Sequence, residues 1–169
     1  MYKKIENIKK IAIISDTHDN IETIEKAVNK IKHEHVGLII HAGDCTTPEA
    51  IEPFLKLNKY LVCVYGNCDT QKEKIKAALG DKGIINNPPF VFYVNDRKIL
   101  LTHDLEKCSK KIKEEQPNIV IFGHDHIVEI EENKDVLYIN PGECGGLLYG
   151  SATITILNMK TLHVDIIEL

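Results

Sequence analysis

Residues 10–44 read KIAIISDTHDNIETIEKAVNKIKHEHVGLIIHAGD, and this stretch has the pattern of an α/β protein. The apolar runs KIAIIS (10–15) and GLIIH (37–41) each predict a buried strand. Between them, apolar residues recur at helical spacing and predict a helix from about 20 to 34: Ile21, Ile24, Ala27, Val28 and Ile31. Short strand–helix–strand connections of this kind imply parallel strands joined by right-handed crossovers.

The same alternation continues downstream and then changes. A short helix around 48–57, a strand YLVCVYG (60–66) and a helix over 71–79 complete the first half. The second half begins with a hairpin, FVFYVNDRKILLT (90–102), turning at Asn95-Asp96. After a helix over about 105–116, further strands are expected at 118–123, 126–132, 136–140, 151–157 and 161–167. Parallel units followed by a mostly antiparallel set predict two sheets packed face to face, with helices outside.

Length and composition predict one compact domain, residues 1–169, of an ordinary globular protein. Of the 169 residues, 43% are hydrophobic and 27% charged, which is typical of soluble domains. No run of 18 apolar residues predicts a membrane span. The apolar patch after the basic start is short and runs into Asp16, so a signal peptide is not expected. We therefore expect a cytoplasmic protein without a membrane partner.

The cysteines and the charged residues indicate the cellular compartment and the kind of ligand to expect. The five cysteines are scattered, odd in number and never spaced as CxxC, which favours reduced thiols over disulfides or a cysteine zinc site. The net charge is −4 and Arg97 is the only arginine, so no nucleic-acid groove is evident. If the substrate is a phosphate ester, something other than arginine must supply the positive charge.

Polar side chains with metal-binding capacity follow five of the predicted strands. They are Asp16 and His18, Asp44, Asn67 with Asp69, His103, and finally His124 with His126. Ligand sites of parallel α/β sheets gather at the carboxyl ends of strands, so these groups are expected to meet in one crevice. Each motif alone has an ordinary explanation, because Gly, Asn and Asp are common turn residues and a single histidine is often structural. Their conjunction at five strand ends favours a site.

The chemistry of these residues favours transition-metal ions. Carboxylate and amide oxygens mixed with imidazole nitrogens, without thiolate, suit Mn²⁺, Ni²⁺, Fe²⁺ or Zn²⁺ better than Ca²⁺ or Mg²⁺. Seven such groups exceed what one ion needs. They suit two ions about 3.5–4 Å apart that share a carboxylate.

With these residues in hand, the sequence resembles the calcineurin-like metallophosphoesterases. The family's ordered motifs stand here as DTH, GD, GNCD, TH and GHDH, from Asp16 to the INPGE stretch at 139–143. The short length, GNCD and INPGE look most like the small YfcE-type phosphodiesterases of bacteria and archaea. The resemblance implies the metallo-dependent phosphatase fold, a four-layer α/β/β/α sandwich of two mixed β-sheets flanked by helices.

The resemblance also implies a division of the ligands between two ions. The first ion would take Asp16, His18, Asp44 and His126, and the second would take Asp44, Asn67, His103 and His124, so that Asp44 bridges. A hydroxide bridging the two metals would attack phosphorus in line. Asn67, Asp69 and His103 would form the catalytic surroundings, with Asp69 orienting its neighbours from outside the ligand set. The turn within INPGE, Asn140 to Gly142, is expected to have a packing role and to supply no ligand.

Two departures from the family's motifs affect substrate chemistry. Many relatives have a histidine, a candidate proton donor to the leaving group, where Cys68 stands, and a thiol is a poor substitute. No clear general acid is left. Asp104 replaces a glycine of the family's THGH motif, which affects substrate contacts more than metal binding. His33, His35, His41 and His163 belong to no motif, and His41 is expected to be structural.

We therefore expect a hydrolase, a metal-dependent phosphodiesterase acting on a small phosphodiester through a dinuclear site. An alternative from another class is a catalytically weak or inactive scaffold for protein interaction, like the retromer subunit that resembles this family. Complete ligand positions speak against that alternative. A nuclease of the same superfamily would be expected to have extra domains or a basic groove. Relatives often form homodimers or homotetramers, but no stripe of the sequence predicts an interface.

Overall fold

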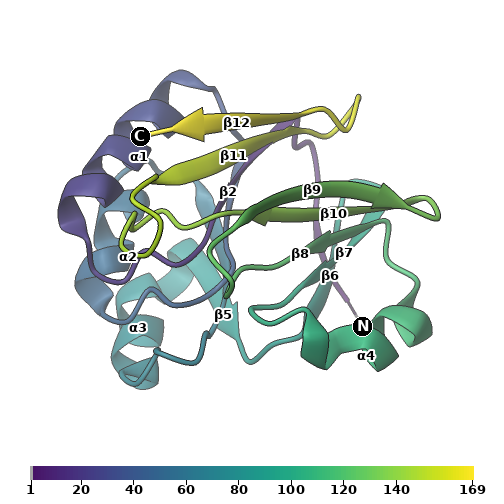
Figure 1. Ribbon diagram of the computed structural model, residues 1–169, viewed down its shortest axis with the longest axis horizontal. Coiled ribbons are helices and arrows are strands. Elements are labelled where there is room, and N and C mark those ends of the chain that lie inside the picture. The colour runs from purple at the N-terminus through teal and green to yellow at the C-terminus, as the bar shows by residue number, and fades with distance from the viewer. Residues whose placement is uncertain (1) are drawn as a thin grey trace.

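The computed structural model describes residues 2–169 and contains two six-stranded sheets (Figure 1). The first sheet has the order β12-β11-β2-β3-β4-β5. Its strands in chain order are β2 (Lys10–Ile14), β3 (Leu38–His41), β4 (Tyr60–Val64), β5 (Gly83–Asn86), β11 (Thr153–Asn158) and β12 (Val164–Glu168). The second sheet has the order β1-β6-β7-β8-β10-β9. Its strands are β1 (Lys3–Ile5), β6 (Phe90–Val94), β7 (Arg97–Leu101), β8 (Ile119–Ile121), β9 (Val128–Asn133) and β10 (Val136–Pro141).

Both sheets are mixed. In the first sheet β2, β3, β4 and β5 are parallel, while β11 runs antiparallel to β2 and β12 antiparallel to β11. In the second sheet three pairs are parallel, β1–β6, β7–β8 and β8–β10, and two are antiparallel, β6–β7 and β9–β10. The expectation of a mostly antiparallel second half was therefore wrong for this sheet. After β7 the chain passes through a helix and enters β8, which runs parallel to β7. After β8 it passes through β9, and β10 then runs parallel to β8.

The alternation of side chains in the strands builds the layers. In β2, Ile11 and Ile13 face the second sheet, whereas Ala12 and Ile14 face the helices, and all four are buried. In β8, Ile119 and Ile121 face the first sheet in the same way. Because both faces of these central strands are covered, they have no polar alternation and appear as continuous apolar runs.

Helices cover the outer face of each sheet. Three of them pack on the first sheet: α1 (Ile21–His33), α2 (Pro48–Leu55) and α3 (Lys72–Leu79). The short α4 (Ser109–Glu115) packs on the second sheet and lies on the other side of the molecule (Figure 1). Two single-turn 3₁₀ helices, η1 (Gly80–Lys82) and η2 (Glu106–Cys108), complete the set. This arrangement confirms the predicted α/β/β/α sandwich.

Most predicted elements agree with the structure to within two residues, and the differences have local causes. The helix expected over 105–116 is divided into η2 and α4. The strand expected from residue 126 begins at Val128, because the backbone at His126 has a φ of 64°. β1 and β5 were not predicted, since both are short and only partly buried. Within residues 2–169, none of the helices combines the length and apolarity needed to span a membrane.

Candidate metal centre

The seven predicted ligands all follow strands, and the two sheets bring those strand ends together. Asp16 and His18 follow β2, Asp44 follows β3, Asn67 follows β4, His103 follows β7, and His124 and His126 follow β8. Three of the strands belong to the first sheet and two to the second. The site therefore lies where the carboxyl ends of strands from both sheets meet, which is the usual place for a ligand site in sheets with parallel strands.

Donor atoms of these residues form one continuous row. Neighbouring atoms in the row are separated by 3.0 Å for His124–Asn67, 3.0 Å for Asn67–His103, 3.4 Å for His103–Asp44, 3.7 Å for Asp44–His18, 3.8 Å for His18–Asp16 and 3.4 Å for Asp16–His126. Atoms bound to one ion at roughly 2.1 Å lie about 3.0–3.4 Å from one another, from bond lengths typical of nitrogen and oxygen ligands. The row therefore has nearly the spacing of a coordination shell.

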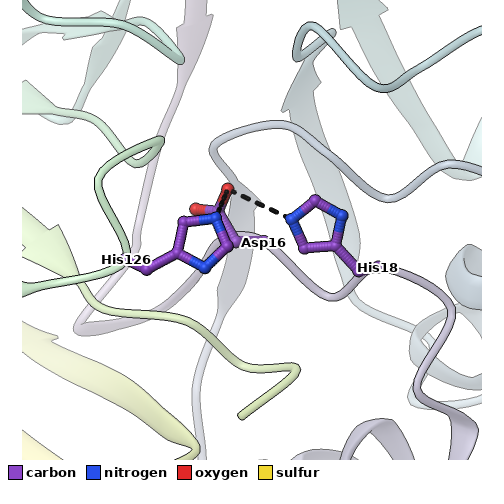
Figure 2. Close-up of side chains that lie close together, drawn as sticks. All are labelled: Asp16, His18 and His126. Atoms are coloured by element: carbon purple, nitrogen blue, oxygen red, sulfur yellow. Dashed lines mark ion pairs between the residues drawn. The ribbon is translucent and has the colours of Figure 1, made fainter. Parts of the chain in front are cut away.

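One end of the row is the cluster of Asp16, His18 and His126 (Figure 2). Both imidazoles point their Nε2 atoms at Oδ1 of Asp16, as the dashed lines in Figure 2 show. Asp16 Oδ1 and His18 Nε2 are buried, yet neither has a hydrogen-bond partner within residues 2–169. Buried polar atoms without partners are rare in proteins and are commonly explained by an ion. The residues present thus fit a divalent cation.

The other end of the row is built around Asp44 and His103. Oδ2 of Asp44 lies 3.4 Å from His103 Nε2, and Oδ1 of Asn67 lies 3.0 Å from the same nitrogen. His124 closes the row through Nδ1, 3.0 Å from Asn67 Oδ1. Because Asp44 also faces His18, its carboxylate lies between the two ends. This is the position that a bridging ligand requires.

Hydrogen bonds outside the row determine which ring nitrogen of His103 and of His126 is available to bind a metal ion. His103 donates its Nδ1–H to the carbonyl oxygen of Ala42 over 2.9 Å, and His126 donates its Nδ1–H to Oε2 of Glu143 over 2.9 Å. In each ring the lone pair then lies on Nε2, the atom that faces the carboxylates. Metal-binding histidines are usually held by this kind of second hydrogen bond.

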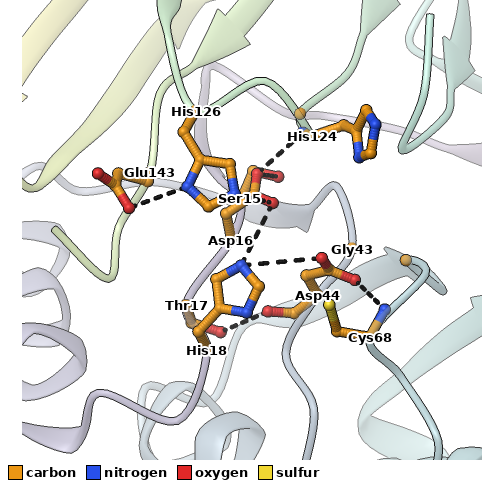
Figure 3. Close-up of polar contacts among 12 residues, drawn as sticks. Ser15, Asp16, Thr17, His18, Gly43, Asp44, Cys68, His124, His126 and Glu143 are labelled. Atoms are coloured by element: carbon orange, nitrogen blue, oxygen red, sulfur yellow. Dashed lines mark hydrogen bonds and ion pairs between the residues drawn. The ribbon is translucent and has the colours of Figure 1, made fainter. Parts of the chain in front are cut away.

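The carboxylates are oriented in the same way, by backbone and hydroxyl donors on their outer oxygens (Figure 3). Oδ2 of Asp16 accepts from the Ser15 hydroxyl and from the backbone N–H of His124. Oδ1 of Asp44 accepts from the backbone N–H of Cys68 over 2.8 Å. Asp16 Oδ1 and Asp44 Oδ2 are left facing the histidines.

The two carboxylates have different electrostatic environments. Burial raises the pKa of Asp16, and the hydrogen bond from Ser15 only partly offsets this. Burial also acts to raise the pKa of Asp44, but the hydrogen bond and charge of His103 outweigh it and hold that pKa below its usual value. The pKa of His103 is raised in turn, because its interaction with Asp44 outweighs burial. Both shifts come from the contact between Asp44 and Nε2 of His103, and a cation bound there would take the place of a proton on that nitrogen.

The backbone is unusual at this site. Of the seven predicted ligands, five have a positive φ: Asp16 (52°), His18 (42°), Asp44 (57°), His124 (81°) and His126 (64°). Residues other than glycine seldom adopt this left-handed conformation, and such strain clusters at functional sites. The chain turns sharply after these strands, and the side chains converge at the edge where the carboxyl ends of the strands meet.

Glycines in two of the motifs let the backbone approach the carboxylates. A Cβ atom on Gly66 would lie 2.0 Å from Oδ1 of Asp44. A Cβ atom on Gly123 would lie 1.9 Å from the Ser15 hydroxyl and 2.6 Å from Oδ2 of Asp16. Side chains at these positions would displace the ligands themselves, which explains glycine in GNCD and GHDH.

Asp69 lies behind the ligands, with its side chain buried. Its two oxygens accept hydrogen bonds from the backbone N–H groups of Gly66 (2.6 Å), Asp44 (3.1 Å) and Thr46 (2.6 Å). These contacts join the loop after β3 to the loop after β4. Through these backbone contacts Asp69 is placed to orient Asp44 and Asn67 from outside the ligand set.

Cys68 is exposed at the mouth of the site. Its Sγ lies within 4.8 Å of donor atoms of both His18 and Asp44. Partial burial, together with Asp44, raises the pKa of its thiol to about 11. The side chain is therefore a protonated thiol at neutral pH, beside the predicted ligands.

Two buried residues outside the predicted set support the site. Glu143 accepts a hydrogen bond from His126, although its stretch was expected to have only a packing role. The sequence marks it only as an acidic residue directly after Asn-Pro-Gly, and its complete burial is seen only in the fold. His41, expected to be structural, is fully buried and bonds to Thr17 and Gly43. The histidines that belong to no motif, His33, His35 and His163, are exposed.

The stacked sheets and the row of donors at their shared edge agree with the class of metal-dependent phosphoesterases that the motifs indicated. Residues 10–162 match the calcineurin-like phosphoesterase superfamily domain, and the chain belongs to this superfamily. It is 39% identical over 157 residues to a phosphodiesterase of Methanocaldococcus jannaschii, a match that covers 89% of this chain and 93% of the relative.

Solved structures agree with this assignment. An archaeal phosphodiesterase is 38% identical and superposes with a TM-score of 0.88, covering 95% of this chain and 99% of its own. YfcE, a phosphoesterase from E. coli, has a TM-score of 0.64 at 15% identity, covering 94% of this chain and 98% of its own. The second likeness shows a common fold only, whereas the first extends to sequence.

Proposed function

We propose that the protein is a metal-dependent phosphodiesterase that hydrolyses a small phosphodiester at a dinuclear centre. The observation that carries this proposal is the unbroken row of seven donors, from His124 to His126, with neighbouring atoms 3.0–3.8 Å apart. Similarity to a phosphodiesterase at 39% identity supports the reaction class. Asp16, His18, Asp44 and His126 would hold one ion, and Asp44, Asn67, His103 and His124 the other.

Two divalent ions bound there would supply an activated water and the positive charge that a phosphoryl transition state needs. The protein's own residues keep the donors ready for this. Asp69 holds the loops that carry Asp44 and Asn67, and the Ala42 carbonyl accepts the Nδ1–H of His103 and so directs its Nε2 inward. Because these contacts exist without reorganisation, the site is preorganised for charge stabilisation.

A diester is favoured over a monoester by the charge of the protein. Arg97, the only arginine, begins β7, whereas His103 follows the opposite end of that strand. No guanidinium is therefore placed to bind a second negative charge on the phosphate. A diester has one negative charge fewer than the dianion of a monoester, and the metal ions alone can neutralise it.

The metal that we propose is Mn²⁺, with Ni²⁺, Fe²⁺ and Zn²⁺ as the alternatives. The donors are carboxylate, amide and imidazole groups, which suit all four ions. Five free cysteines, four of them buried, support a reducing compartment, and we propose a cytoplasmic location on that ground.

The test is hydrolysis of a chromogenic phosphodiester and the matching monoester, with Mn²⁺ or Ni²⁺ and with a chelator. We expect metal-dependent turnover that favours the diester, and two metal ions per chain by mass spectrometry after gentle purification. Asp44→Asn should lose both turnover and metal. Asp165→Asn, a change on an exposed strand residue, is the matched control and should retain both.

The scaffold alternative makes the opposite prediction. A protein that uses this fold only for protein interaction would have no turnover on either ester, and Asp44→Asn would change nothing that the assays measure. The complete donor row is not required by such a scaffold. Absence of metal-dependent turnover on both esters would therefore overturn the proposed enzyme.

A further inference from the structure

An apolar wall stands beside the donors. Leu147 and Leu148 are 59% and 66% exposed, a large exposure for two adjacent leucines. They line the same pocket of about 310 Å³ as six other residues, namely His18, Asp44, Asn67, Cys68, His124 and His126. The lining of this pocket therefore combines five predicted ligands and Cys68 with two apolar side chains.

The wall is held in place by buried Glu143. Its carboxylate accepts hydrogen bonds from the backbone N–H groups of Leu147 (2.9 Å), Leu148 (2.9 Å) and Tyr149 (2.8 Å). The same carboxylate accepts from His126 Nδ1 at 2.9 Å. One buried side chain thus fixes both a predicted ligand and the two leucines, so their relative position is set by the fold.

The loop that carries the two leucines, residues 145–149, is also attached at its start to the loop that follows β2. The backbone N–H of Gly145 donates to the carbonyl oxygen of Asp16 over 3.0 Å, and the Asn20 side chain donates to the carbonyl of Gly145 over 2.7 Å. Gly146 follows with a φ of 63°, which turns the chain back across the site. Exposure of the leucines is therefore a property of an anchored loop.

Adjacent exposed leucines on an anchored loop at a polar site point to a ligand with an apolar part. A phosphoester whose phosphoryl oxygens lie at the donors can place its organic group against these leucines, which line the same pocket. We propose that Leu147 and Leu148 form a subsite for an apolar ester group, aromatic or alkyl, and so determine which phosphoesters bind. This inference rests on the proposed function and names its substrate class.

Continuity with the donors favours a small ligand over a second copy of the chain. The two leucines share their pocket with five predicted ligands and Cys68, so a protein surface seated on them would also cover the site. Tyr149 is similarly exposed, at 63%, but does not line the pocket. Tyr149 provides a matched control in the same loop, because replacing its side chain keeps the backbone N–H that donates to Glu143.

The test compares phenylphosphonate with methylphosphonate, which differ only in the organic group and are not hydrolysed. Their binding to the Mn²⁺-loaded protein is measured by calorimetry. We expect phenylphosphonate to bind at least about tenfold more tightly, in line with what apolar pockets discriminate. Leu147→Ser with Leu148→Ser should abolish this preference and leave methylphosphonate binding and metal content unchanged. Tyr149→Ser and the conservative Leu148→Met should keep it.

Equal binding of the two phosphonates by the wild-type protein would overturn the subsite, as would a preference that survives in the double serine variant. If the double serine variant has a changed mass in light scattering and keeps the preference, the two leucines form an interface between copies, and the subsite is overturned. If neither phosphonate binds, the subsite is overturned too. Metal-dependent hydrolysis of the chromogenic diester then shows whether the proposed function fails with it.

Discussion

His126 and Glu143 form a buried pair in which the imidazole donates its Nδ1–H to the carboxylate over 2.9 Å. Burial acts to raise the pKa of Glu143, but the hydrogen bonds from Tyr149, His126 and neighbouring N–H groups outweigh it and lower that pKa. Glu143 is therefore an anion that orients His126, as carboxylates commonly do for metal-bound histidines.

Glu143→Gln should weaken metal binding without unfolding the protein. The amide has the same shape but no charge, and one of its two ends is an NH₂ group that cannot accept from the loop. We expect metal affinity to fall roughly 10- to 100-fold, the usual effect of losing such a partner. Calorimetric Mn²⁺ titration measures this. Glu131→Gln, on the exposed strand β9, should leave the affinity unchanged, and equal affinities in all three proteins would contradict the role of Glu143.

Gly66→Ala should damage the centre through Asp44. The new Cβ would lie 2.0 Å from Oδ1 of Asp44, so the carboxylate must move and lose its hydrogen bond from Cys68. We expect about 1–3 kcal/mol of lost stability from the overpacking, together with weaker metal binding. Urea unfolding and metal titration measure the two effects separately.

Gly80→Ala is the matched control for that variant. Gly80 has a φ of 54° and open space around it, so an added methyl group is strained but touches nothing. About 1–3 kcal/mol of stability should be lost from backbone strain alone, because a φ of 54° combined with a ψ of −131° is a conformation that favours glycine. Metal affinity should not change. A parallel loss of affinity in both alanine variants would show that destabilisation, and not the displaced carboxylate, weakens the site.

The layers of the fold could be predicted because the central strands are buried on both faces. Runs such as that of β2 are apolar throughout, so strand and helix positions are visible without tertiary information. β1 could not be predicted in this way, because Lys3 and Lys4 are exposed and the strand exists only through its pairing with β6. The parallel pairing of β8 with β10 depends likewise on a return path that no local pattern specifies.

The donor row could be predicted from residue types at strand ends, whereas its supports could not. Asp16, Asp44 and the histidines stand directly after apolar runs, where the topology of the sheets brings them together. Glu143 acts through N–H groups of the following loop, and only the folded path of that loop brings those groups to it. The apolar wall was invisible for the same reason, because Leu147 and Leu148 resemble any two core residues in the sequence.

Cys68→His should speed the hydrolysis of esters with poor leaving groups. The raised pKa of the Cys68 thiol, about 11, makes it a weak acid beside the site. An imidazole titrates near neutral pH and can donate a proton to the leaving oxygen, an effect typically worth 10²–10⁴-fold where geometry is good. We expect at least about a tenfold rise in kcat for an alkyl leaving group and little change for p-nitrophenolate. Cys68→Ser is the control and should show no gain on either ester.

The buried imidazole of His41 should make stability depend on pH. Burial lowers the pKa of His41 to about 4, against an ordinary value of 6.5. The backbone N–H of Gly43 donates to Nδ1, so the proton lies on Nε2, which faces the Thr17 hydroxyl. Protonating Nδ1 would break the bond from Gly43 and place a charge in the core.

The sign of the effect follows from which state binds the proton. Between pH 6.5 and about 4 the unfolded chain is protonated at His41 and the folded protein is not, so stability falls as the pH falls. The loss attributable to His41 should be about 2 kcal/mol between pH 7 and pH 5. Urea unfolding at both pH values measures it. His41→Asn keeps an acceptor for Gly43 but does not titrate, so its stability should fall less over this interval. His163→Asn, at an exposed position, should behave like the wild type, and identical pH dependence in all three proteins would exclude His41 as the source.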